Sequence, residues 1–203
     1  MINHGKAKWA LIATLTIAFV LSGCAGTVKN MQPFAGDLAT IAPEPGKAMI
    51  VFMRPSTLGS AIQSSVFRVA EGTPEVVGIV AAKAKVSYQV DPGEHLFMVI
   101  GESADFMSAE VEAGKTYYAL VTPRMGVWKA RFSLKPVARP DQDRTQLDEW
   151  LEACSWVEKS AATESWAAEN MADINDKQAS YYIKWMEKSE ADRPRLTPQD
   201  GIL

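Results

Sequence analysis

Residues 47–138 contain eight short segments that are either continuously apolar or alternate between apolar and polar residues, and turns rich in proline and glycine separate them. Ala48–Met53 is a continuous apolar run that stops before Pro55, which is typical of a buried strand. Such segments, spaced about 8–12 residues apart, favour an antiparallel β-sandwich of about eight strands. The predicted strands are 48–53, 62–70, 75–81, 86–90, 95–101, 106–112, 116–122 and 128–137.

Two of the turns have residues that favour a tight reversal of the chain. Asp91-Pro92-Gly93 separates 86–90 from 95–101, and Ala113-Gly114-Lys115 separates 106–112 from 116–122. Proline presets φ, and glycine reaches the positive φ values that many turns need. Both strand pairs are therefore predicted to be hairpins.

The periodicity becomes helical after Pro140. An apolar stripe from Leu147 to Val157 includes Cys154 and predicts one helix, and a second stripe from Ala167 to Trp185 predicts a helix over 163–190. The short link near Ser160 predicts that residues 139–190 form an antiparallel helical hairpin. Residues 191–203 hold two prolines and are expected to be a loose tail. The predicted fold class is thus α+β, a sandwich followed by a helical hairpin.

The N-terminus has the layout of an export signal. Lys6 and Lys8 precede an apolar run over Trp9–Leu21, whose thirteen residues are too few to span a bilayer. Leu21-Ser22-Gly23-Cys24 follows and resembles the lipobox of bacterial lipoproteins. The resemblance implies that a signal peptide of residues 1–23 is removed and that Cys24 carries the lipid, including palmitate-type acyl chains.

Two further expectations follow for the mature N-terminus. Ala25 after the lipid-bearing cysteine, where an inner-membrane protein would have aspartate, implies an outer-membrane address, with the periplasmic side expected. Residues 24–46 are rich in proline and glycine and are expected to be the anchor and a flexible tether, spanning roughly 25 Å as a coil.

Residues 47–138 also resemble a family of small bacterial envelope lipoproteins whose β-sandwich domain has no assigned function. The matching segments are Gly46–Ser56, Asp91–His95 and Ala113–Tyr118, which consist mostly of one strand and two turns. The resemblance implies a β-sandwich fold and a location in the cell envelope, and it identifies no catalytic residue.

Composition and residue counts argue against several classes of function. Without residues 1–23 the chain keeps 19 basic and 24 acidic residues, so a nucleic-acid partner is not expected. With Cys24 lipidated, Cys154 is the one remaining thiol and His95 the one histidine, which predicts neither a disulfide nor a metal site. No catalytic motif or cofactor signature is present, so the chain is predicted not to be an enzyme.

The aromatic residues of the C-terminal region are the candidate interaction surface. Trp156 and Tyr182 lie off the predicted helical stripes and are expected to be exposed. Exposed aromatic rings can dock a protein or stack on a sugar. The leading hypothesis is a lipoprotein that binds an envelope protein or has a structural role there. The alternative is a small-ligand or glycan-binding module, for which the polar loop Arg54–Ser60 is a candidate.

Overall fold

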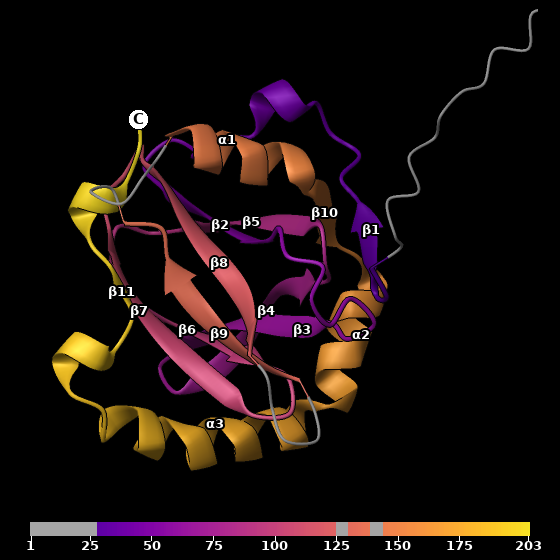
Figure 1. Ribbon diagram of the computed structural model, residues 1–203, viewed down its shortest axis with the longest axis vertical. Coiled ribbons are helices and arrows are strands. Elements are labelled where there is room, and N and C mark those ends of the chain that lie inside the picture. The colour runs from indigo at the N-terminus through magenta and orange to yellow at the C-terminus, as the bar shows by residue number, and fades with distance from the viewer. Residues whose placement is uncertain (1–27, 125–129, 139–143) are drawn as a thin grey trace, which may run out of the picture.

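The computed structural model describes residues 28–124, 130–138 and 144–203, which form a mostly β fold with two mixed sheets and three α-helices (Figure 1). The first sheet has six strands in the order β1-β10-β5-β2-β8-β9, and the second has five in the order β11-β7-β6-β3-β4. The strands are β1 Met31–Pro33, β2 Ala48–Arg54, β3 Ser64–Ala70, β4 Thr73–Val80, β5 Ala84–Val90, β6 Gly93–Ile100, β7 Ala104–Val111, β8 Thr116–Arg124, β9 Arg131–Pro136, β10 Ser155–Lys159 and β11 Arg195–Leu196. The helices are α1 Arg144–Ala153, α2 Ala161–Glu169 and α3 Met171–Met186.

The eight strands predicted from periodicity all occur, as β2 to β9, and the two-sheet arrangement is consistent with the predicted sandwich. The first two residues of the predicted strand 128–137 lie outside the described residues. The count of about eight strands is too low, because three short strands (β1, β10 and β11) add to the edges of the sheets. The prediction of purely antiparallel sheets is also wrong, since β2–β8, β10–β5 and β11–β7 are parallel pairs.

Both predicted hairpins are instead connections between the two sheets. β5 pairs with β2 and β10, whereas β6 pairs with β3 and β7. β7 and β8 are likewise in different sheets. Gly93 (φ 123°) and Gly114 (φ 78°) supply the positive φ values that these reversals use. The same turn residues suit both a hairpin within one sheet and a connection between two sheets. The packing of the two sheets decides which of the two forms.

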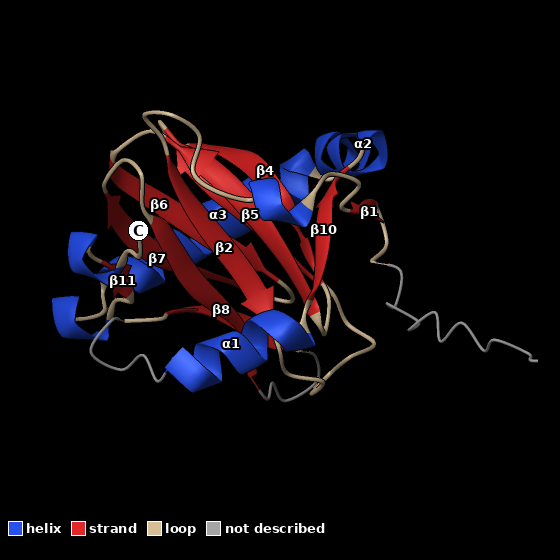
Figure 2. Ribbon diagram, turned by 90° about the horizontal axis from the view of Figure 1, so that it is seen from above, coloured by secondary structure: helices blue, strands red, loops and turns tan. Residues whose placement is uncertain are grey.

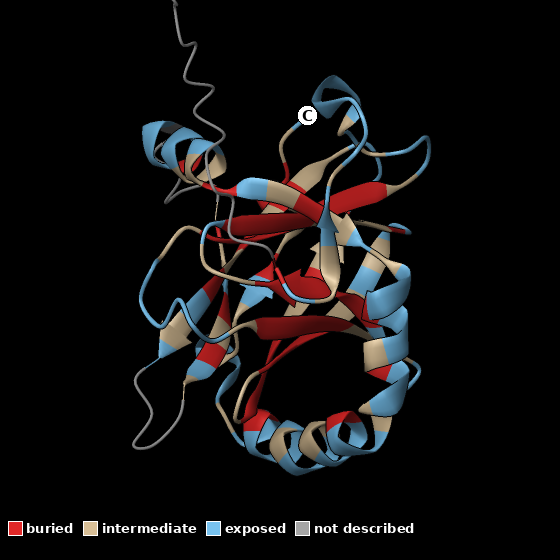
Figure 3. Cartoon of the chain, turned by 90° about the vertical axis from the view of Figure 1, so that its right-hand side faces the viewer, coloured by how far each residue is buried: buried red, intermediate tan, exposed pale blue. Residues whose placement is uncertain are grey.

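The main core lies between the sheets. Phe52 of β2 and Phe97 of β6 come from opposite sheets, and their ring centroids lie 5.1 Å apart. The outer faces are covered as well, α1 lying on the six-stranded sheet and α2 and α3 on the five-stranded sheet (Figure 2). Burial on both faces explains why β2 is continuously apolar rather than alternating. Figure 3 shows buried strands enclosed by helices whose outward faces are exposed.

The predicted helical hairpin is not found. The first helix ends at Ala153, and residues 155–159 form β10, which extends the six-stranded sheet beyond β5. The backbone of β5 needs hydrogen-bonding partners on that edge, and this requirement overrides the helical stripe through Val157. The expected second helix is divided at Asn170 into α2 and α3. Its predicted stripe is correct in part, because Ala167, Ile174 and Trp185 are buried.

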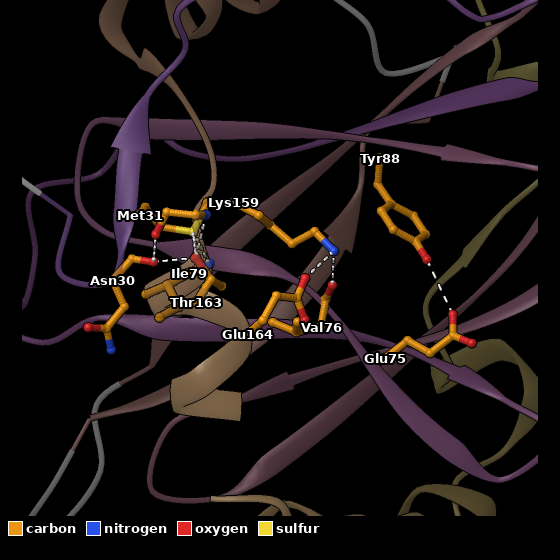
Figure 4. Close-up of polar contacts among 10 residues, drawn as sticks. Asn30, Met31, Glu75, Val76, Ile79, Tyr88, Lys159, Thr163 and Glu164 are labelled. Carbon is orange, nitrogen blue, oxygen red and sulfur yellow. Dashed lines mark hydrogen bonds and ion pairs between the residues drawn. The ribbon is translucent and has the colours of Figure 1, made fainter. Parts of the chain in front are cut away.

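The segment expected to be a flexible tether belongs to the fold from Val28 onward. Val28 is buried in the main core, and β1 pairs with β10. The Asn30 carbonyl accepts a hydrogen bond from the Thr163 hydroxyl, and the Ile79 amide donates to the Met31 sulfur over 3.3 Å (Figure 4). These contacts join residues more than 40 positions apart, so sequence periodicity could not reveal them.

The predicted loose tail is also ordered. β11 pairs with β7, and Leu196 is completely buried in the main core. The Lys115 ammonium donates to the Pro198 carbonyl over 2.9 Å, and Ile202 forms an isolated bridge with Thr116. α3 already ends at Met186, before either proline, and β11 lies between Pro194 and Pro198, the second of which begins a short 3-10 helix.

Candidate functional site

Tyr182 lies on α3 with one ring face packed against the protein. Its ring centroid is 5.5 Å from that of Phe106 and 5.9 Å from that of Trp185, which is buried. Tyr182 is 38% exposed, and beside it are Ile183 at 64% and Met186 at 45%. Residues three and four positions apart share a helix face, so these side chains form one continuous patch. We call Tyr182, Ile183 and Met186 the α3 apolar surface.

An open groove of about 470 Å³ runs between this part of α3 and the outer face of the five-stranded sheet. Tyr182 and Trp185 line it on the helix side, while Arg68, His95 and Arg195 line it on the sheet side. Arg195 is already paired, with its guanidinium 2.6 Å from Glu110 and 3.6 Å from Glu94. The His95 Nε2 lies 2.7 Å from the Asp91 carbonyl oxygen, which holds the ring to its own turn. The groove therefore offers aromatic faces, charged groups and the Ser108 hydroxyl.

Trp156 is partly buried in β10 and lines a different cavity, of about 680 Å³, on the outer side of the six-stranded sheet. The ammonium of the buried Lys85 lies 4.7 Å from the Trp156 ring centroid and donates to the Leu151 carbonyl near the end of α1. Burial lowers the pKa of Lys85. A cation at a helix C-terminus is favoured by the helix dipole, so Lys85 joins α1 to the sheet.

The two aromatic residues predicted to be exposed therefore do not form one surface. Trp156 is in a strand of the six-stranded sheet, and Tyr182 is on the helix that covers the five-stranded sheet. Ile183 and Met186 also lie outside the apolar stripe, but they were missed because only aromatic residues were considered as candidates for exposure. Cys24 lies outside the described residues, and its lipidation stays a prediction.

A third cavity, of about 390 Å³, lies where α2 meets β4 and β5. The Lys159 ammonium contacts the Glu164 carboxylate at 2.8 Å and the Val76 carbonyl at 3.3 Å (Figure 4). Across the same cavity the Tyr88 hydroxyl is 3.4 Å from Glu75, and burial raises the pKa of Tyr88. The Lys159 contacts join β10 to α2 and to β4, and the Tyr88 contact joins β5 to β4, so these polar groups have structural partners.

Cys154 is buried immediately after α1 and is a free thiol. The prediction that it lies in a core is confirmed, although it follows the helix rather than lying within it. It packs with Met53, Val137 and Leu147 on the outer side of the six-stranded sheet. Burial raises the pKa of the thiol, which reduces the reactive thiolate near neutral pH.

We therefore expect thiol reagents to label Cys154 slowly in the folded protein and rapidly after denaturation. Cys154→Ser should lower the free energy of unfolding by about 1–3 kcal/mol, because the hydroxyl would be buried without an assured partner. Mass spectrometry of the labelled protein and urea unfolding measure these effects, with Cys154→Ala as the apolar control. Rapid labelling under native conditions would contradict the buried placement.

The described residues contain no cluster of three or more histidine, cysteine, aspartate or glutamate side chains suited to hold a metal ion. None of the helices in the described ranges combines the length and hydropathy needed to cross a bilayer. No protein-family model matches the chain, and no curated protein is significantly similar to it.

Proposed function

We propose that the mature protein is a non-enzymatic lipoprotein whose two sheets form a β-sandwich and which is held at the outer membrane through Cys24. In this proposal its α3 apolar surface binds a protein partner in the cell envelope. The lipobox-like segment supports the anchor, and the resemblance to envelope lipoproteins agrees with that address.

The α3 apolar surface is the observation that carries the binding proposal. Most large apolar side chains of the described residues are buried. Three of the exposed ones nevertheless lie in a single five-residue stretch of α3, 182–186. A cluster of exposed apolar groups beside polar residues is typical of a protein-interaction site. The Tyr182 ring packs against Phe106 and Trp185, so its position is fixed in the unbound protein. Such preorganisation reduces the entropy lost on binding.

The structure also limits how far a lipid on Cys24 would allow the domain to move from the membrane. Val28 is buried in the core, and it is only four positions after Cys24 in the sequence. A chain reaches at most about 3.6 Å per residue, so the domain would begin within about 14 Å of the anchor. The proposed lipoprotein is thus a membrane-proximal domain rather than one on a long tether.

Photocrosslinking in intact cells tests the α3 surface. A photoreactive residue at Ile183 is expected to capture a discrete protein partner, and Met186→Asp beside it should reduce the captured yield at least roughly tenfold, because it places a charge in an apolar contact. The same photoreactive residue at the exposed Glu152, on α1, serves as the control and should not capture this partner. An unchanged thermal midpoint for Met186→Asp would show that the fold is intact. No capture from Tyr182, Ile183 or Met186, or a yield that Met186→Asp leaves unchanged, would contradict the proposal.

The groove under α3 favours the alternative of a small-ligand or glycan-binding module. The Tyr182 and Trp185 rings are stacked, with 25° between their planes, and both line the groove with His95 and charged side chains. Such a combination of ring faces and hydrogen-bonding groups suits a sugar. Glycan binding that Tyr182→Ala removes, with no protein captured at Ile183, would favour this alternative.

A further inference from the structure

Four basic side chains from three elements of the fold converge on one cavity of about 280 Å³, on another side of α3. Arg124 ends β8, Arg131 begins β9, and Lys184 and Lys188 come from α3 and the residues just after it. Asp105 of β7 is the one acidic residue among the described residues that line it. We call this cavity the Asp105 pocket. Its lining therefore has a large positive excess in a chain whose formal net charge is −3.

Asp105 engages only part of this positive charge. Its carboxylate is buried and lies 3.1 Å from the Lys188 ammonium and 3.4 Å from the Arg124 guanidinium, and it also accepts a hydrogen bond from the Ser133 hydroxyl. Both carboxylate oxygens thus have partners within the protein. Asp105 has little capacity left to neutralise the remaining cations.

The other two cations lack a close carboxylate. Arg131 is 3.9 Å from Glu102, at the outer limit of an ion pair. Lys184 lies 4.9 Å above the Tyr181 ring, and across the described ranges no carboxylate is within ion-pair distance of it. Arg124 and Arg131 are moreover directly opposite each other in the β8–β9 register. Like charges at opposed strand positions repel, so an anion bound between these two half-exposed arginines would be favoured.

Trp185 and Tyr181 also line the pocket, so aromatic rings as well as cations border it.

We propose that the Asp105 pocket binds a phosphate-class oxyanion, either inorganic phosphate or the phosphomonoester of a lipid headgroup. Two guanidinium groups offer fork-shaped donor pairs that match phosphate oxygens, and the lysines add point charges. This proposal goes beyond the α3 apolar surface and does not depend on lipidation of Cys24.

Isothermal titration of the full chain in a non-ionic detergent tests the site. Inorganic phosphate is titrated at constant ionic strength, with chloride as the reference anion. Two further titrations use short-chain phosphatidic acid, which has a phosphomonoester, and short-chain phosphatidylcholine, which lacks one. We expect saturable binding of phosphate or of phosphatidic acid, and the tighter of the two identifies the source of the ligand.

Substitutions locate the binding. Arg131→Gln combined with Lys184→Gln should weaken phosphate binding by at least roughly tenfold, because each removes a charged donor. Asp105→Asn should tighten it, since the competing carboxylate charge is lost. Lys177→Gln is the matched control, because Lys177 is on the same helix but pairs with Asp173 away from the pocket. Equal affinities in the double variant and the control, or binding of phosphatidylcholine as tight as that of phosphatidic acid, would overturn the proposal.

Discussion

Cys24→Ser is expected to leave the chain without lipid and to release it from the membrane fraction. A serine hydroxyl does not replace the thiol as the acceptor of the diacylglycerol group, so no acyl chain can attach there. Each buried methylene contributes about 0.8 kcal/mol to membrane binding, which makes the loss of all chains effectively complete. Incorporation of radiolabelled palmitate, together with fractionation of the cells, measures the effect.

Cys154→Ser is the control for that experiment. Cys154 is the other cysteine of the chain and is buried in the folded domain, so its replacement should leave palmitate incorporation unchanged. Equal labelling of Cys24→Ser and the unaltered chain would end the lipoprotein proposal. That result would not affect the phosphate-binding proposal for the Asp105 pocket, because the pocket is formed by residues of the folded domain alone.

Arg54→Ala is expected to lower the free energy of unfolding by about 3–5 kcal/mol. Arg54 is 0% exposed at the end of β2, where its guanidinium lies 4.9 Å from the Phe132 ring. It donates to the carbonyls of Leu58, Gly59 and Ile62 over 2.6–2.8 Å and so holds the loop that follows the strand. Alanine would remove the guanidinium donor from these carbonyls, of which that of Gly59 would keep the Ile62 amide, and would open a cavity at the end of β2.

Urea unfolding followed by tryptophan fluorescence measures this loss, and hydrogen exchange should show faster opening of residues 56–63. Arg68→Ala is the matched control, because Arg68 is partly exposed and pairs with Glu75 at the surface, where an ion pair contributes at most about 1 kcal/mol. Equal urea midpoints for the two variants would contradict the structural role of Arg54. Arg54 would then not be needed for folding, and the loop Arg54–Ser60 would again be a candidate ligand site, as the sequence suggests.

The candidate sites could be predicted from sequence only in part. Tyr182 was identified because it falls outside the apolar stripe of its helix, and the same reasoning applies to Ile183 and Met186. Trp156 also lies outside its predicted helical stripe, yet it is partly buried. The prediction fails here because Trp156 belongs to strand β10, where helical spacing does not apply. The Asp105 pocket had no sequence signal, since Arg124, Arg131 and Lys184 are brought together from separate strands and a helix.

The sequence by itself determined the eight strands β2 to β9, where the chain turns and that Cys154 is buried. These properties depend on local spacing, because apolar periodicity reports the burial of each face and proline and glycine report the turns. Only the tertiary structure decided which strands pair, that the turns at Gly93 and Gly114 cross between sheets, and that β1, β10 and β11 complete the sheet edges. Backbone hydrogen bonding at a sheet edge is available to any segment that packing brings there, so its partner is chosen by the whole fold rather than by local sequence.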